Sequence, residues 1–257
     1  MYLELLSYSA TAPSTGAAAT AATGDSLTIR NAKSKAQIVA WWTKAQTIGT
    51  HELLFPSGHD TSRGIRVQAP VGIALHDLPI IEVQPQELMT INIVGSATAG
   101  DVEAGCFLVF YGDMPGLQGR LIKADEVDRR ARALLTIENT QASTAGIYGV
   151  EELITAESNV LRADSDYAVL GITGSLTVLA NYLKGPDVAA ARIGCPPPTP
   201  LTGTHLTDSF FYRLSQRTGL PTIPVINSGN RASTYLGQST DENAAASMQH
   251  TTLALLS

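Results

Sequence analysis

Histidines and neighbouring acids are the residues of this chain whose types could bind a metal ion. His51 is followed by Glu52, as in the His-Glu-x-x-His zinc motif, but Phe55 stands where the second histidine is needed. That motif requires two histidine ligands at i and i+4 on one helix face. The other histidines are isolated in the sequence: His59, His76, His205 and His250. We therefore expect structural or surface histidines and no metal site, with convergence of three of them in space as the lesser alternative.

Asp164-Ser165-Asp166 could offer carboxylate oxygens to Ca²⁺. A calcium loop also needs a glycine turn and a terminal glutamate, and neither follows here. A turn or a cap before a strand is the better interpretation. The sequence also lacks Gly-x-Gly-x-x-Gly and Gly-Lys-Ser/Thr, the glycine loops that hold phosphates. We therefore expect no cofactor.

Gly24-Asp25-Ser26-Leu27 resembles the nucleophile block of the GDSL hydrolases, and this resemblance implies Ser26 as the nucleophile. In that family a buried apolar strand precedes the block and an Asp-x-x-His pair supplies the base. Here small, mixed residues precede the block, and no histidine has an aspartate three positions before it. A turn that opens a strand is favoured, and we expect no catalytic residues.

Two further clusters could contact a partner. Trp41 and Trp42 could stack on a sugar or anchor a protein, although one core ring and one half-exposed ring is the favoured interpretation. Arg129, Arg130 and Arg132 alternate with acids on a predicted helix, which favours a solvated or interface helix face over a nucleic-acid site. No Lys or Arg occurs between Arg66 and Arg120, so the stretch cannot track a nucleic-acid backbone. We expect no direct nucleic-acid binding.

Composition narrows the class of protein. The chain has 257 residues, of which 44% are hydrophobic and only 16% are charged, and its formal net charge is −6. About a quarter of the residues are charged in a typical soluble domain. A surface of Ser, Thr, Gly and Ala suits contacts with other subunits. We expect neither a signal peptide nor a membrane span. A disulfide between Cys106 and Cys195 is possible in principle but not favoured.

The chain divides by composition into two parts. Residues 1–24 form a low-complexity N-terminal arm, predicted to cross to an adjacent subunit, and residues 25–257 form a β-sandwich. A single sandwich is favoured over two pseudo-repeated halves, 25–150 and 151–257.

Strand patterns dominate after the arm, and they predict a mainly β fold, an antiparallel β-sandwich of jelly-roll type. Residues 88–94 and 106–111 are predicted to form a hairpin or a close pair. Other strands are expected at 26–30, 52–55, 64–68, 167–173, 175–180, 187–193, 222–227, 234–238 and 247–256. Apolar residues spaced i, i+3, i+4, i+7 predict a helix over 35–46, and charge and capping patterns predict helices over 125–135 and 208–217.

Four segments together resemble bacteriophage virion structural proteins with jelly-roll folds. They are His59 to Arg66, Tyr111 to Gly116, Lys184 to Gly194 and Gly219 to Asn227. The resemblance implies self-assembly through trimers or other symmetric units, other virion proteins as partners, and no catalysis. It implies location in the virion after assembly in the host cytoplasm, and it does not separate a shell subunit from a cement or decoration protein. The alternatives are a carbohydrate- or receptor-binding β-sandwich and, less favoured, a serine hydrolase.

Overall fold

The computed structural model has a mainly β fold with antiparallel strand pairs. The description covers residues 1–12, 17–18, 20–21, 26–34, 36–54, 64–69, 72–94, 98, 100–143, 148–155, 161–174, 178–189, 191–198, 207–239 and 244–257.

The first 111 residues form two sheets. The strands are β1 (Tyr2–Ala12), β2 (Ala17–Ala18), β3 (Thr20–Ala21), β4 (Ala36–Ala45), β5 (Gly49–Leu54), β6 (Ile65–Ala69), β7 (Gly72–His76), β8 (Ile81–Val83), β9 (Thr90–Val94) and β10 (Asp101–Tyr111). One sheet has the order β3-β1-β10-β4-β7, with β8 also paired to β4, and the other has the order β2-β9-β5-β6. When the short β3 and β8 are left out and the remaining strands are numbered 1 to 8 along the chain, the two sheets have the orders 1-8-3-6 and 2-7-4-5. This is the strand order of a jelly roll.

The residues from 131 onward repeat this order. The strands are β12 (Ala131–Ser143), β13 (Glu152–Leu153), β14 (Asp166–Thr173), β15 (Ala180–Lys184), β16 (Arg192–Cys195), β17 (Ile223–Asn227), β18 (Tyr235–Ser239) and β19 (Ala244–Leu256). Their sheets are β12-β19-β14-β17, extended by β11 (Leu121–Ile122), and β13-β18-β15-β16. In chain order these are again 1-8-3-6 and 2-7-4-5. Helix α3 (Phe210–Thr218) lies between β16 and β17, and a 3₁₀ helix, Ser228–Ser233, follows β17.

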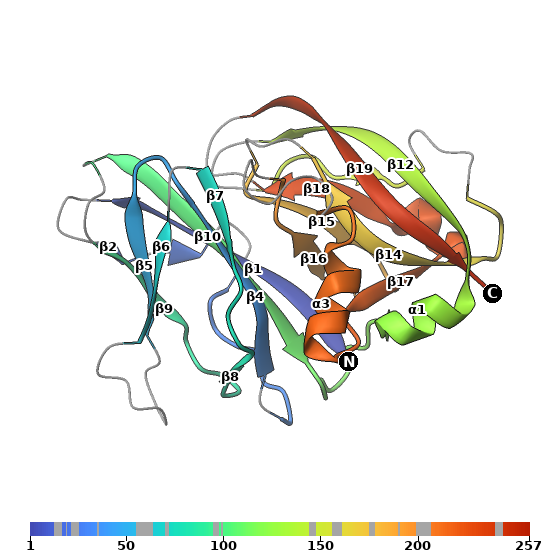
Figure 1. The fold of residues 1–257 in the computed structure, drawn as a ribbon, viewed down its shortest axis with the longest axis horizontal. Coiled ribbons are helices and arrows are strands. Elements are labelled where there is room, and N and C mark those ends of the chain that lie inside the picture. The colour runs from blue at the N-terminus through green and yellow to red at the C-terminus, as the bar shows by residue number, and fades with distance from the viewer. Residues whose placement is uncertain are drawn as a thin grey trace.

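The chain therefore folds into two complete jelly rolls in tandem, which lie side by side in Figure 1. The jelly-roll fold class is confirmed, but a single sandwich, which the sequence favoured, is not what forms. The change of roll falls within residues 112–130, which carry β11 and helix α1 (Ala124–Arg130). A division at residue 150 would separate β12 from the rest of the second roll.

One sheet of the first roll, β1-β10-β4-β7, is buried on both faces. Trp41 and Phe107 face the partner sheet of the same roll, where their rings stack with centroids 5.0 Å apart. On the opposite face, Trp42 donates a hydrogen bond from Nε1 to the Leu179 carbonyl at 2.8 Å and its ring contacts Phe210 of α3. The second roll thus covers the outer face of this sheet.

This double burial explains why the helix predicted over 35–46 is wrong. The segment is strand β4, paired with β10 on one side and with β7 and β8 on the other. A strand buried on both faces is a nearly continuous apolar run rather than an alternating one. Apolar residues that happen to fall at helical spacing within such a run cannot be told from a helix by periodicity.

The predicted arm also needs correction where the structure describes it. Residues 2–12 are strand β1, which pairs with β10 from Tyr2↔Tyr111 to Ala12↔Asp101 and therefore lies inside its own subunit. Large apolar side chains favour this position because the strand packs on both faces: Leu3 and Leu5 face the second roll, and Tyr2, Leu6 and Tyr8 face the core of the first roll. Leu5 contacts the second roll closely at Gly194. The predicted arm residues 13–16, 19 and 22–24 lie outside the described part of the chain.

Two other predictions change with the pairing. Strands β9 and β10 do not form a hairpin, because β9 pairs with β2 and β5 while β10 pairs with β1 and β4. Helix α1 ends at Arg130, earlier than predicted, because Ala131 onward pairs with β19. The predicted helix over 208–217 agrees closely with α3, which ends at Gly219 with a φ of 70°. Glycine adopts this left-handed conformation without the strain that a Cβ brings.

Candidate functional site

A cavity of about 550 Å³ opens between residues 26–31, strand β1 and the start of β16. Its wall carries several polar and charged side chains, as ligand sites do. Its lining residues are Glu4, Leu5, Leu6, Ser26, Thr28, Ile29, Arg30, Asn31, Gln86, Met114, Ala191 and Arg192.

Two of the three charged residues in the cavity wall, Glu4 and Arg30, are paired with each other. Arg30 Nε donates to both carboxylate oxygens of Glu4 at 2.9 Å, and Arg30 Nη2 also donates to Glu4 Oε1. Tyr111 Oη donates to Glu4 Oε2 at 3.2 Å. Hydrogen bonding to Glu4 raises the pKa of Arg30, whereas burial is the main cause that raises the pKa of Tyr2 and Tyr111. The cluster ties β1 to the segment before β4.

Ser26, the nucleophile implied by the GDSL resemblance, is exposed at this cavity. Its Oγ accepts a hydrogen bond from the Thr28 amide at 3.2 Å, which is a local turn contact. Gly24 and Asp25 of the same block lie outside the described residues. No histidine is among the described residues that line the cavity, so the structure shows no general base beside Ser26.

A second polar cluster is entirely inside the first roll. Tyr8 Oη and His51 Nδ1 are hydrogen-bonded at 2.8 Å, and His51 Nε2 and Glu103 Oε2 lie 3.0 Å apart. Trp41 Nε1 donates to Tyr8 Oη at 3.0 Å. The His51 and Glu103 side chains have no exposed surface, and burial is the main cause that raises the pKa of Tyr8. Buried polar groups in such a chain hold neighbouring strands in one arrangement.

His51 lies on strand β5, and its imidazole bridges Tyr8 and Glu103. His76 on β7 is hydrogen-bonded to Thr43 Oγ1 at 2.8 Å, and burial together with His51 lowers its pKa to about 4. His250 lies on β19, while His59 and His205 are outside the described residues. Within the described part of the chain, no three His, Cys, Asp or Glu side chains converge on a possible metal position.

Trp41 and Trp42 are not available to a sugar or a partner. Their exposed fractions are 1% and 0%, because neighbouring residues of a strand point to opposite faces and both faces are covered here. The expectation of one half-exposed ring is wrong for the same reason. Both cysteines are buried and neither is in a disulfide, and burial raises the pKa of Cys195.

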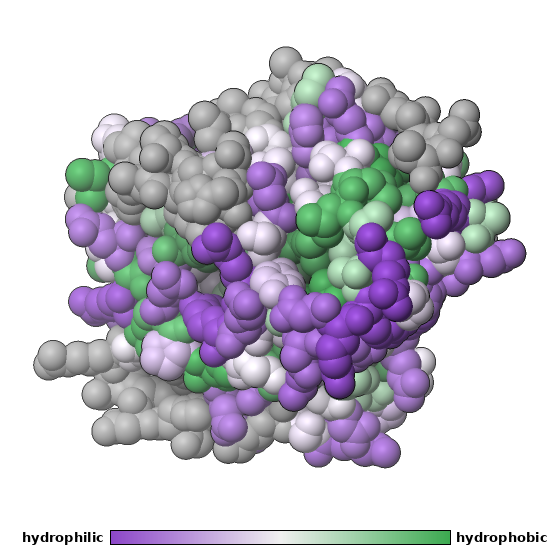
Figure 2. Space-filling model, turned by 45° about the vertical axis from the view of Figure 1, so that its right-hand side comes forward, coloured by the Kyte–Doolittle hydropathy of each residue, from purple (hydrophilic) through white to green (hydrophobic). Residues whose placement is uncertain are grey.

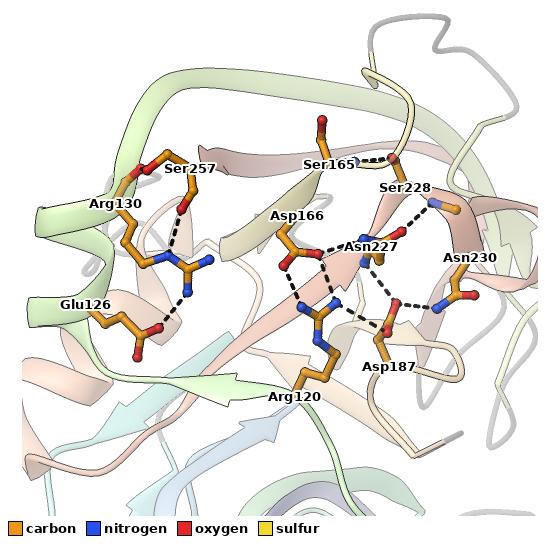
Figure 3. Close-up of polar contacts among 11 residues, drawn as sticks. Arg120, Glu126, Arg130, Ser165, Asp166, Asp187, Asn227, Ser228, Asn230 and Ser257 are labelled. Carbon is orange, nitrogen blue, oxygen red and sulfur yellow. Dashed lines mark hydrogen bonds and ion pairs between the residues drawn. The ribbon is translucent and has the colours of Figure 1, made fainter.

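The predicted interface arginines lie at the junction of α1 and β12. Arg129 and Arg130 are in α1 and pair with Asp125 at 3.5 Å and with Glu126 at 2.6 Å. Arg130 Nε also donates to the Ser257 carbonyl at 3.1 Å, which holds the C-terminal end of β19 to the helix (Figure 3). Arg132 is instead the second residue of strand β12 and is exposed.

Arg120, which belongs to the same basic stretch of the sequence, anchors the linker between the rolls (Figure 3). Its guanidinium donates two hydrogen bonds to Asp166, at 3.0 and 2.6 Å, and lies 3.6 Å from Asp187. These hydrogen bonds lower the pKa of Asp166 and raise that of Arg120. Asn227 donates from its side-chain Nδ2 to Asp166 and from its backbone N–H to Asp187.

This Arg120 network answers the question that Asp164-Ser165-Asp166 raised. The segment forms the turn before β14, and both carboxylate oxygens of Asp166 accept hydrogen bonds from the Arg120 guanidinium. Only the aspartates carried a signal in the sequence. The arginine partner of Asp166 lies 46 positions away and could not be identified from spacing.

Comparison with known proteins yields structural likenesses only. No family model matches the chain, and no curated protein sequence does. The PBSX exported protein XepA is 12% identical with a TM-score of 0.29, over 98% of this chain and 86% of that one. The major capsid protein of bacteriophage PM2 is 10% identical with a TM-score of 0.24, over 100% and 98%. The protein YhaK from Escherichia coli is 11% identical with a TM-score of 0.23, over 100% and 87%. At these scores nothing about the role of this chain follows.

Proposed function

We propose that this chain is a structural protein of a bacteriophage virion that assembles with copies of itself, with a trimer as the favoured unit. It acts in or on the capsid, as a shell subunit or as a cement protein, and it works without catalysis. The observation that carries the proposal is the fusion of two complete jelly rolls into one block through a sheet buried on both faces.

The block is well suited to carry load between neighbours. The linker is pinned to the second roll by the Arg120 network, and the Gly119 amide is hydrogen-bonded to the Met1 carbonyl at 2.8 Å in the first roll. A repeated contact between rigid copies costs little conformational entropy, so weak surfaces can add up to a stable assembly. Low charge density reduces the desolvation that such surfaces require.

The polar sites favour this role over the two alternatives. The ring pair that would have recognised a sugar is inside the fold. Arg129 and Arg130 are paired with acids of their own helix, which suits contact with a protein better than contact with a phosphate backbone. No described helix is long and apolar enough to span a membrane.

The test is the mass of the purified full chain by light scattering over a range of concentrations, followed by electron microscopy of the same sample. Shells or lattices would support a shell subunit. A closed oligomer that forms no shell but binds to assembled capsids would support a cement protein. A strict monomer at high concentration that also fails to bind capsids would overturn the proposal.

A further inference from the structure

Strand β12 is an open edge of the second roll. It pairs with β19 along its length, and no strand among the described residues pairs with its other side. Its thirteen residues include no proline and no glycine, so every outward amide and carbonyl can take part in a new ladder. Long, unprotected edges of this kind are where sheets join other chains.

The first roll contains an internal comparison. There the corresponding first strand, β1, has its outer side covered by β3, which pairs antiparallel through Tyr8↔Ala21 and Ser9↔Thr20. The same topological edge thus accepts an antiparallel strand in one roll and is uncovered in the other.

The first residues of β12 also include exposed apolar side chains. Leu134 is 69% exposed, and its neighbours Ala131 and Ala133 are exposed too. In Figure 1 this strand lies at the margin of the molecule, and Figure 2 shows apolar surface on this side, bordered by hydrophilic groups. A free apolar edge gains stability when a second strand covers it.

We propose that β12 pairs antiparallel with β12 of a second copy, about a twofold axis at Leu135. This register places Arg132 of each copy opposite Glu138 of the other, because each lies three positions from Leu135. It also places Leu134 opposite Thr136 and Ala133 opposite Ile137. Two symmetric ion pairs would then flank a short apolar ladder, which is the isologous pattern of a twofold contact.

The two charged residues of β12 favour a second copy of β12 as the partner strand, and they favour the register with its twofold axis at Leu135. Arg132 and Glu138 are the only charged residues of β12, and Arg132 forms no ion pair with another described residue. Glu138 is half exposed and lies 3.9 Å from His250. Sliding the partner by two residues would put Glu138 opposite Leu134 and leave both charges unmatched. The strand is therefore complementary to itself in one register.

The irregularity between Ala131 and Ala133 limits the contact. A bulge bends the strand there, so the regular ladder covers Ala133–Ile137 of each copy, with Arg132 just beyond it. A ladder this short suits a contact between assembled units rather than the main interface of an oligomer. The inference rests on the proposed self-association and specifies one of its surfaces.

Cysteine pairing tests the register directly. Opposed residues of antiparallel strands have Cα atoms about 4.5–5.5 Å apart, within disulfide range, whereas diagonal residues are about 7–8 Å apart. The Leu134→Cys protein mixed with the Thr136→Cys protein should give a cross-linked dimer under mild oxidation, and either variant alone should give at least tenfold less. The native cysteines are buried and form no disulfide. Met248→Cys, exposed on the adjacent strand, is the matched control and should not cross-link with either.

Charge exchange separates this contact from self-association in general. Arg132→Glu and Glu138→Arg should each lower the yield of the cross-linked dimer several-fold, and the double variant should restore it, while Arg129→Glu on α1 should leave it unchanged. An oligomer of unchanged mass that never cross-links through β12 would overturn this inference and leave the proposed function standing. A monomer that forms no cross-link at any concentration would count against both.

Discussion

Glu103 is a carboxylate with no exposed surface, and His51 is the described side chain that lies against it. One of its oxygens, Oε1, has no hydrogen-bond partner within the described residues. Gly49 is needed beside it, because a Cβ there would come within 2.5 Å of both carboxylate oxygens. A buried charge that depends on one partner makes that partner energetically important.

Replacing His51 with leucine should therefore destabilise the fold strongly. The change leaves Glu103 and Tyr8 buried without their shared partner, and we expect a loss of about 3–5 kcal/mol in the free energy of unfolding. Urea denaturation of His51→Leu measures it. The exposed pair of His250 and Glu138 provides the control, since His250→Leu should change stability by about 0.5 kcal/mol or less. Equal losses in the two variants would contradict the assigned role of the buried chain.

His76 should make stability depend on pH. Its pKa falls from 6.5 to about 4 on folding, chiefly because of burial and secondly because of His51. Between these two pKa values the unfolded chain therefore binds a proton that the folded chain does not bind. The contribution of His76 to the free energy of unfolding is complete above pH 6.5 and is lost as the pH falls toward 4. Thermal melts of the wild type and of His76→Gln across this range should converge at low pH. Parallel curves would rule out His76 as the source.

The sequence could predict that these histidines are structural, because none has a second ligand at motif spacing. It could not reveal the chain from Tyr8 to Glu103, whose members are 43 and 52 positions apart. Strand pairing brings them together, and no local pattern encodes that pairing. The same is true of Trp42, whose burial depends on a second roll more than a hundred residues away.

At the scale of elements, Arg120 holds the linker between the two rolls, residues 112–130, against the second roll. The bidentate contact with Asp166 holds β11 against the ends of β14 and β17. The guanidinium is 42% exposed, so solvent weakens the ion pair, and Arg120→Ala should cost about 1–2 kcal/mol rather than the value of a fully buried pair. Arg120→Lys should recover little, because an ammonium cannot form the paired hydrogen bonds.

Chemical denaturation with Arg129→Ala as the control measures this contribution. Arg129 is an exposed arginine of the same region, and its removal should change stability by less than about 0.5 kcal/mol. If Arg120→Lys were as stable as the wild type, the geometry of the paired hydrogen bonds would not be what stabilises the linker.

Helix α3 ends because of one backbone conformation. Gly219 has a φ of 70°, and no atom lies within 4 Å of the position a Cβ would occupy. Gly219→Ala should therefore cost about 1 kcal/mol through backbone strain alone. Gly219→Asn should cost less, because asparagine tolerates this region better. Melting temperatures of the two variants give the order, and the reverse order would contradict a purely conformational cause.

Elements whose ends carry strong local signals were predictable, and elements whose burial is unusual were not. Strand β17 and helix α3 were predicted within two residues, since proline, glycine and capping residues bound them. Strand β4 was assigned as a helix because burial on both faces removes the alternation of a strand. The end of α1 was misplaced because pairing with β19 overrides a sequence that would otherwise continue the helix.

The whole molecule should unfold as one unit. The rolls share the core that covers the outer face of β1-β10-β4-β7, and Gly194 allows the close approach, since a Cβ there would lie 2.7 Å from Leu5 Cδ2. Calorimetry of the wild type should show a single transition, and Gly194→Val should split it into two by wedging the rolls apart. Adding Leu5→Ala should partly restore the single transition. Gly112→Ala, whose Cβ would have its nearest neighbour at 3.7 Å, is the control.

Class of fold could be predicted at this scale, but the number of rolls could not. Short strands separated by turn residues indicate an antiparallel sandwich whichever way the strands are shared out. The duplication is topological and is not marked by repeated residues. It becomes visible only when the pairing of distant strands, such as β1 with β10, is known.

During synthesis of the chain, the pairing of β12 with β19 is delayed. Strand β12 finds its partner only when β19 has been made, and Ala131 and Ala244 are separated by 113 positions. At about 5–20 residues per second, that interval lasts roughly 6 to 23 s. The first roll can close during this time, while both edges of β12 are bare. In a cell producing many copies at once, premature pairing between nascent chains thus competes with completion of the second roll, and the final thirteen-residue strand ends that competition.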